Sequence, residues 1–289
     1  MFFRVDSEEA TLRNSILSST PNPEFDSSQS PLDPQLVPLA APPAVSGENP
    51  PWTGWDVAQI VVLTIGSVFV LVLATALAAH RLFYPHVPFL DVAAYPLVTL
   101  LAQFLAYLVV LAFMYFVVAH NPQEKFFRAL RWNWPRNWSV YLLAGVALSL
   151  GLQLFAHLLP MPKELPVDRF FQTTQQAWLF SIFGVTFAPL MEELFFRGFL
   201  YPVLARRTGT AAAVLITSLA FSLIHASQLG RAWAPVLVIF LVGLVLTVTR
   251  AVTKSVAAGL LIHIAYNGTL TFLMFVGTQG FRHMEKLSQ

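Results

Sequence analysis

Long apolar runs follow one another through most of this chain, and they limit what it can fold into. We place them at residues 55–79, 93–119, 140–159, 178–205, 211–226, 233–249 and 255–276. About 20 apolar residues are enough for an α-helix to cross the hydrocarbon core of a bilayer. Charged residues make up 11% of the chain, whereas soluble domains carry about 25%. The sequence therefore predicts an all-α polytopic membrane helix bundle of about seven transmembrane helices.

An eighth element and two tails complete the predicted organisation. Residues 167–176 are the candidate for an eighth helix, although their polarity favours a segment at the membrane interface. Residues 1–51 are rich in Pro, Ser and acidic side chains, and they offer too little apolar surface to offset the entropy of ordering. We predict a disordered cytosolic tail there, a polytopic domain over 52–278 and a short polar tail over 279–289.

The distribution of Lys and Arg over the loops predicts the orientation in the membrane, because cytosolic loops carry an excess of these residues. With the N-terminus in the cytosol, the outer loops carry Arg81, Lys163, Arg169 and Arg231. The inner loops then carry about twice as many, which are Lys125, Arg128, Arg131, Arg136, Arg206, Arg207, Arg250 and Lys254. Arg282 and Lys286 in the C-terminal tail would lie outside and weaken this bias. The loops favour a cytosolic N-terminus.

Three charged residues lie inside the fourth apolar run. Glu192, Glu193 and Arg197 would each cost roughly 2.5–3.5 kcal/mol in lipid, so their presence needs a reason. At helical spacing Glu193 and Arg197 are i,i+4 neighbours and can form an ion pair. Glu192 lies about 100° further round the helix and cannot share that geometry. An unpaired carboxylate within the membrane is a functional candidate by default.

Two later spans carry polar residues that can reach Glu192. Glu192 and His225 each lie about 16 residues from the turn at 207–210, and α-helices rise about 1.5 Å per residue. In an antiparallel hairpin of unbroken helices they therefore lie at the same depth. His263, with Asn267 on the same helix face, lies about ten residues after the next cytosolic turn. The spacing predicts one site in the inner half of the bilayer.

Each of these residues also has a purely structural interpretation. A single intramembrane His is about as often a hydrogen-bonded helix contact as a functional group. A single Asn more often holds two helices together than acts as a catalytic donor. The Glu193–Arg197 pair can be structural as well. Three polar centres at one depth favour a site instead, because polar groups in the bilayer are costly to keep.

The residue types indicate hydrolysis by activated water. A Glu and a His can together bind and deprotonate a water molecule, while a second His and an Asn amide can donate to the oxyanion that forms on the attacked carbonyl. The chain has no cysteine, which excludes a thiol nucleophile, and no G-x-S-x-G segment. The sequence thus predicts cleavage of a peptide bond within or beside the membrane.

Three short motifs on separate predicted spans are similar to those of a known family. They are E-E-x-x-x-R, F-x-x-x-H and H-x-x-x-N, formed by Glu192, Glu193, Arg197, Phe221, His225, His263 and Asn267. On these motifs the chain resembles the CPBP family of intramembrane endopeptidases, which comprises CAAX proteases and bacteriocin-processing enzymes also called Abi proteins. The resemblance covers residues 177–276, and the surrounding P-L-M-E-E-L-F-F-R-G-F-L is similar to the bacterial branch.

The resemblance implies roles for the motif residues. Glu192 and His225 would activate the water molecule, and His263 and Asn267 would form the oxyanion site. The residues that would support the site are Glu193, Arg197 and Phe221. The resemblance also implies an active-site cavity inside the membrane and a membrane-associated protein or peptide as substrate. It further implies a bacterial inner (plasma) membrane as the location. The formal charge of +2 gives no reason to expect nucleic acid as a partner.

The residues leave a second mechanism and two other classes of protein open. No cofactor is favoured, since H-E-x-x-H is missing, but Glu192, His225 and His263 could serve as a Glu/His/His ligand set for zinc. The other classes are a non-catalytic immunity or chaperone-like membrane protein and a proton-coupled transporter. The complete motifs argue against the first class, and the lack of an inverted repeat argues against the second.

Overall fold

The computed structural model describes residues 48–120 and 124–283. Every regular element in these two ranges is helical, which confirms the all-α prediction. The chain divides into two units, Met1–Ala44 and Val45–Gln289. The first unit holds most of the predicted disordered tail and lies outside the described residues.

Six helices of the described ranges are long and apolar enough to cross a membrane. They are α2 (Gly54–Leu82), α4 (Pro96–Ala119), α6 (Trp138–Ala156), the composite α7–α9 (Thr174–Thr208), α11 (Trp233–Thr253) and α12 (Val256–Gly277). A seventh apolar helix, α10 (Thr210–His225), coincides with the fifth predicted span but is shorter. The number of membrane crossings therefore stays a prediction. In the segment considered for an eighth helix, residues 167–171 belong to the short 3₁₀ helix η2 (Pro166–Phe171) and residues 174–176 begin α7.

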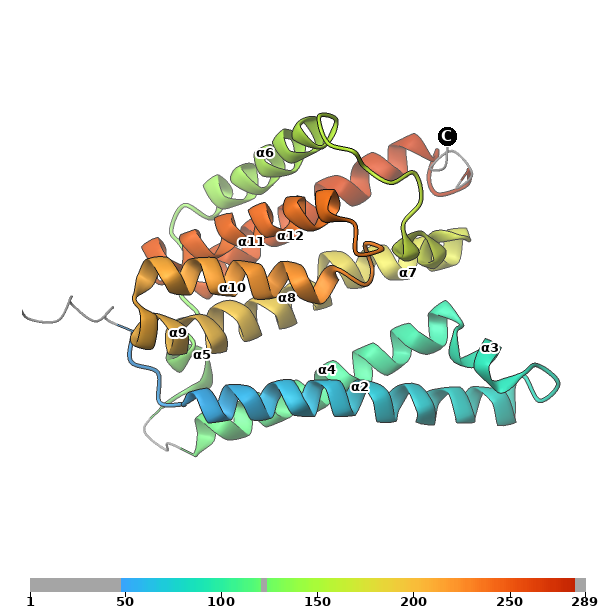
Figure 1. Cartoon of the computed structure of the whole chain (residues 1–289), viewed down its shortest axis with the longest axis horizontal. Coiled ribbons are helices and arrows are strands. Elements are labelled where there is room, and N and C mark those ends of the chain that lie inside the picture. Colours follow the sequence, from blue (N-terminus) through green and yellow to red (C-terminus); the bar gives the residue numbers. More distant parts are fainter. Residues whose placement is uncertain (1–47, 121–123, 284–289) are drawn as a thin grey trace, which may run out of the picture. The chain divides into compact units, whose positions relative to one another are not determined.

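The helices pack as neighbouring pairs. α2 lies along α4, and the short helix α3 (Phe89–Ala93) joins them (Figure 1). α6 lies along α12, and α10 lies along α11, which in turn contacts α12. A loop with the short helix α5 (Phe126–Ala129) connects α4 to α6. The residues of the three sequence motifs are thus carried by the fourth apolar run, α10 and α12.

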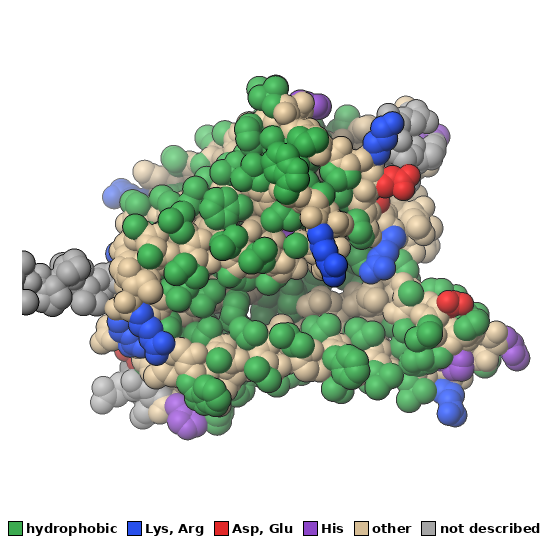
Figure 2. All heavy atoms as spheres, in the orientation of Figure 1, with side chains coloured by type: hydrophobic (Ala, Val, Ile, Leu, Met, Phe, Trp, Pro, Cys, Tyr) green, Lys and Arg blue, Asp and Glu red, His purple; other side chains and the backbone are tan. Residues whose placement is uncertain are grey.

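Large apolar side chains are exposed along the lengths of the helices. Figure 2 shows them over most of one face, with Lys, Arg, Asp and Glu side chains gathered toward the helix ends. Phe69 on α2, Leu154 on α6 and Val252 on α11 are examples, each more than two-thirds exposed. A bilayer accounts for this surface, because its hydrocarbon solvates apolar side chains and excludes unpaired charge. The chain is an integral, multi-pass membrane protein.

The fourth span departs from the unbroken helix assumed from its sequence. It consists of α7 (Thr174–Val185), α8 (Phe187–Glu192), the π-helix η3 (Glu193–Leu200) and α9 (Tyr201–Thr208). The break at Thr186 lies three residues before Pro189, which has no N–H to continue the bonding and fits only in the first turn of the new helix. Gly198 belongs to the π-helix, and a Cβ there would lie 2.6 Å from Leu130 Cδ2. Pro189 thus lies just after the break between α7 and α8, and the close contact of Gly198 with Leu130 lies within the π-helix.

A close contact between α6 and α12 yields a first testable prediction. A Cβ at Gly145 would lie 2.3 Å from the carbonyl oxygen of Ile262, next to His263. We expect Gly145→Ala to lower the melting temperature in detergent by several degrees, because overpacking costs about 1–3 kcal/mol. Gly151→Ala on the same helix is the matched control, since no atom lies within 4 Å of its added methyl group. Equal melting temperatures for the two variants would contradict the packing.

Candidate active site

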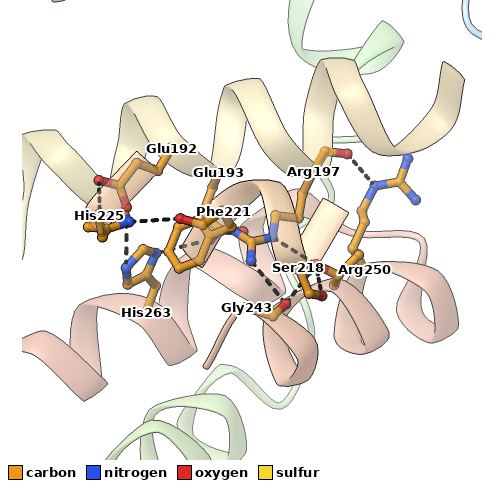
Figure 3. A network of polar contacts seen from close by, with 10 residues as sticks. Glu192, Glu193, Arg197, Ser218, Phe221, His225, Gly243, Arg250 and His263 are labelled. Carbon is orange, nitrogen blue, oxygen red and sulfur yellow. Dashed lines mark hydrogen bonds and ion pairs between the residues drawn. The ribbon is translucent and has the colours of Figure 1, made fainter. Parts of the chain in front are cut away.

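Glu192 and two histidines from different helices meet at one point of the bundle. Glu192 ends α8, His225 is the last residue of α10, and His263 lies in α12. The Nε2 atom of His225 lies 3.6 Å from Glu192 Oε1, and the Nε2 atom of His263 lies 3.6 Å from Glu192 Oε2 (Figure 3). The structure therefore brings together the three centres for which the sequence predicted one depth.

The other ring nitrogens of the two histidines are fixed by acceptors. His225 Nδ1 lies 2.8 Å from the carbonyl oxygen of Phe221, and His263 Nδ1 lies 3.0 Å from Glu193 Oε1. A carbonyl or carboxylate oxygen only accepts, so each Nδ1 carries the hydrogen and donates it. In a neutral imidazole the Nε2 atom is then unprotonated. Both neutral rings would direct an Nε2 lone pair at the Glu192 carboxylate.

The ion pair predicted from sequence spacing is present and completely buried. Arg197 Nη1 lies 3.0 Å from Glu193 Oε1, and neither side chain has any exposed surface. Arg197 Nη2 also donates to the Gly243 carbonyl at 3.1 Å, and Arg197 Nε donates to Thr247 Oγ1 at 3.3 Å. Glu193 Oε1 thus accepts from Arg197 and from His263 at once. This shared oxygen couples the buried pair to the orientation of the His263 ring.

Phe221 separates the histidines from the buried arginine. Its ring centroid lies 4.5 Å from the Arg197 guanidinium carbon, 5.0 Å from the His225 ring and 5.8 Å from the His263 ring. The guanidinium is placed for a cation–π contact. The backbone carbonyl of Phe221 also orients His225. The structure thus gives Phe221 contacts that fit the supporting role implied for it.

Asn267 is engaged with another part of the fourth span. Its Nδ2 donates to the carbonyl oxygen of Gly184 at 2.7 Å, which links α12 to α7. This contact matches the structural interpretation of Asn267 as a residue that joins two helices. It takes up one of the two N–H groups of the amide. The oxyanion role of Asn267 stays a prediction.

Residues 174–269 match the family model of the Rce1-like type II CAAX prenyl endopeptidases. Over this segment, called the CPBP segment below, the chain is similar to the CPBP family that its motifs resemble. The CPBP segment runs from the start of α7 into α12 and contains all the residues of the three motifs. Helices α2, α4 and α6 lie outside it. No curated protein and no solved structure matches the chain.

The CPBP segment shares a cavity with helices α2 and α4. The cavity measures about 330 Å³ and contains Glu192 and His225 in its wall. Apolar side chains of α2 and α4 form much of the rest, among them Val61, Ile65 and Met114. Glu192 and His225 therefore face a largely apolar space.

Sequence reasoning missed the polar residues that α4 contributes to this wall. Gln103 and Tyr107 line the cavity beside Glu192 and His225. They are i,i+4 neighbours and so lie on one face of α4. Their polarity within an apolar run was a usable signal. That Gln103 and Tyr107 lie near Glu192 depends on how the α2–α4 pair packs, and no sequence motif indicates this packing.

A second buried ion cluster was also missed. The sequence analysis assigned Arg250 to a cytosolic loop and Glu48 to the polar tail. The structure places Arg250 within α11 and buries both side chains, with Arg250 Nη1 2.8 Å from Glu48 Oε1 and Nη2 3.0 Å from Oε2. Arg131 and Lys254 each lie 3.4 Å from the same carboxylate. Lys and Arg near helix ends were counted as loop charges, and a partner 202 residues away has no local signal.

Proposed function

We propose that this protein is an intramembrane endopeptidase that hydrolyses peptide bonds of membrane-associated proteins or peptides with water activated by Glu192 and His225. The observation that carries the proposal is the approach of the Glu192 carboxylate and two imidazole Nε2 atoms at the wall of an apolar cavity. The CPBP match over 174–269 supports the same class of reaction.

The separation of the proposed bases suits a bridging water. At 3.6 Å, Glu192 Oε1 and His225 Nε2 are too far apart for a direct hydrogen bond. A water molecule on the cavity side can donate one hydrogen to each of them. Glu192 takes the proton as the water oxygen attacks the substrate carbonyl carbon. The proton then passes to the nitrogen of the leaving amine as the C–N bond breaks.

His263 and Asn267 are the proposed donors to the tetrahedral oxyanion. With Nδ1–H given to Glu193, His263 can donate from Nε2 only as the doubly protonated imidazolium. That charge would lie between the carboxylates of Glu192 and Glu193, at 3.6 Å and 3.0 Å. Asn267 has one further N–H beside the one given to Gly184. Such donors act best when preorganised by a buried network like this one.

The substrate class follows from the shape and lining of the cavity together with the family. Side chains from α2 and α4 offer an apolar wall opposite Glu192, which suits an apolar peptide segment or an attached lipid chain. The name of the matching family refers to prenylated CAAX substrates. We place the reaction at a bacterial inner membrane, as the resemblance of the motifs implies, and the N-terminus in the cytosol, as the loop charges indicate.

Zinc is the alternative to metal-free hydrolysis. Glu192, His225 and His263 have the donor types of a catalytic zinc site. Within residues 48–120 and 124–283, no three His, Cys, Asp or Glu side chains are placed as a group that could hold a metal ion. We write the mechanism with these residues as base and donors, and derive no step through a metal.

The proposal predicts peptide cleavage without a gradient and without metal. The purified protein in detergent should cut a lipid-modified or membrane-embedded peptide into two products, detected by mass spectrometry. Prolonged chelation followed by desalting should leave the rate unchanged, because a carboxylate and an imidazole activate the water. Glu192→Gln protein, purified in parallel, is the control for a contaminating protease.

Two results would contradict this prediction in different ways. Activity that is lost on chelation and returns only with zinc, together with stoichiometric bound metal, would replace the mechanism by the zinc alternative. Solute transport in sealed vesicles by folded protein that never yields cleaved peptide would support the proton-coupled transporter. Folded protein that does neither would support an immunity or chaperone-like role.

A further inference from the structure

The π-helix η3 follows directly after Glu192 and carries Glu193 and Arg197. Helices of this type are rare, and they occur mostly as single turns at functional sites. This one extends over eight residues. Because its geometry positions both neighbouring glutamates, whatever holds η3 in place also sets the directions of their carboxylates. The contacts of its backbone carbonyls with other segments therefore show what holds η3 in place.

Two of these carbonyls accept hydrogen bonds from side chains that lie far away in the sequence. Arg250 Nε donates to the carbonyl of Arg197 at 3.1 Å, as Figure 3 shows. Trp52 Nε1 donates to the carbonyl of Phe199 at 3.0 Å, and the Trp52 and Phe199 ring centroids lie 4.4 Å apart. Both donor side chains are almost completely buried. They hold the π-helix at two positions from outside.

Glu48 fixes the first of these donors. Its carboxylate accepts two hydrogen bonds from the Arg250 guanidinium, which leaves Nε directed at the Arg197 carbonyl. Burial raises the pKa of the Glu48 carboxyl, but the hydrogen bonds and charge of Arg250, with the charges of Arg131 and Lys254, outweigh it and lower the pKa. The carboxylate therefore stays ionised at neutral pH, and stability from this cluster is lost only as the pH falls through the lowered pKa.

The chain between Glu48 and Trp52 is fastened to α9 as well. Arg206 donates to Asn49 Oδ1 at 3.3 Å and to the carbonyls of Pro50 and Trp52 at 3.4 Å each. The stretch just before α2 is thus bound to α9, to η3 and to α11.

We propose that residues 48–52 and Arg250 form a clamp that holds the π-helix in the geometry needed for Glu192 and Glu193 to face the histidines. The clamp residues are positioning residues, since none of them lines the cavity. The inference rests on the proposed function where activity is concerned. It assigns a role in catalysis to residues 48–51, which were predicted to belong to the disordered tail, and to Trp52, the first residue of the predicted polytopic domain.

Three conservative variants test the clamp. Glu48→Gln keeps the shape and removes the charge, Trp52→Phe keeps a stacked ring and removes the donor, and Arg250→Lys keeps a charge without the planar fork. Each should lower kcat per folded molecule by about ten- to hundredfold, because small misplacements of catalytic groups have effects of this size. KM should stay unchanged. Asp56→Asn is the matched control, since its side-chain bonds to Thr53 are exposed and do not reach η3.

Hydrogen exchange supplies a readout that does not need activity. The amides of residues 193–200 should exchange faster in each clamp variant, while those of α10 should not change. If Glu48→Gln fails to fold, Trp52→Phe carries the test, because it removes one hydrogen-bond donor and part of the indole but no charge. Unchanged exchange over 193–200 overturns the clamp, whatever happens to activity. Wild-type protein that cleaves no peptide overturns the proposed function instead, and the exchange data still decide the clamp.

Discussion

Replacing Glu192 by glutamine is expected to abolish peptide hydrolysis while the protein still folds and inserts. The amide has nearly the shape of the carboxylate but cannot accept a proton from water, and loss of a general base lowers rates by about 10²–10⁴-fold. Among the described residues Glu192 pairs with His225 and His263, whereas Glu193 pairs with Arg197, so the replacement of Glu192 leaves the buried Arg197 with its counter-charge. Single-turnover cleavage of a peptide in detergent, normalised to folded protein, measures the effect.

The control for this variant is Glu164→Gln. Glu164 is exposed in the loop between α6 and η2, and removing its charge changes the net charge by the same amount. We expect its activity and melting temperature to match the wild type. His225→Ala should resemble Glu192→Gln, because the proposed water bridges both side chains. Substantial turnover by Glu192→Gln would remove Glu192 from the role of base.

The helices and the meeting of three polar centres could be predicted from the sequence for physical reasons. Hydropathy records which segments cross the bilayer, since lipid excludes unpaired polar groups from each span. Two residues at equal distances from a tight turn lie at the same depth in the membrane. Gly209, with φ of 80°, forms this turn between α9 and α10. Glu192 and His225 meet as expected even though the span is interrupted by Thr186 and a π-helix.

The rest of the site depends on contacts that leave no pattern in a single sequence. The bond from Asn267 to the Gly184 carbonyl requires the α7–α8 break to present that carbonyl. The wall with Tyr107 requires α4 to pack beside the catalytic helices. Arg250 looked like a loop cation because Lys and Arg gather at helix ends, and its buried partner Glu48 precedes the first span. Each is decided by tertiary packing.

The Glu193–Arg197 pair is expected to show the largest effect on stability. Removing one member leaves the other charge buried and unpaired, which costs about 3–5 kcal/mol. We therefore expect Glu193→Gln and Arg197→Met each to lower the melting temperature and the yield of folded protein strongly. Glu193→Gln should retain some activity per folded molecule, because its amide oxygen can still accept from His263 Nδ1. Thermal unfolding in detergent and activity per folded molecule separate the two effects.

A double-mutant cycle with Glu193→Leu and Arg197→Met as the single variants decides whether charge is the cause. The variant with Glu193→Leu and Arg197→Met removes both buried charges together, and replacing a buried ion pair by apolar residues is often nearly neutral. Its melting temperature should therefore lie above that of Arg197→Met alone, although the bonds to Gly243 and Thr247 are lost in both. Its activity should still fall, since His263 loses the acceptor that orients it. Additive losses of stability would show that Glu193 and Arg197 act independently, and the buried pair would then have no part in holding the site.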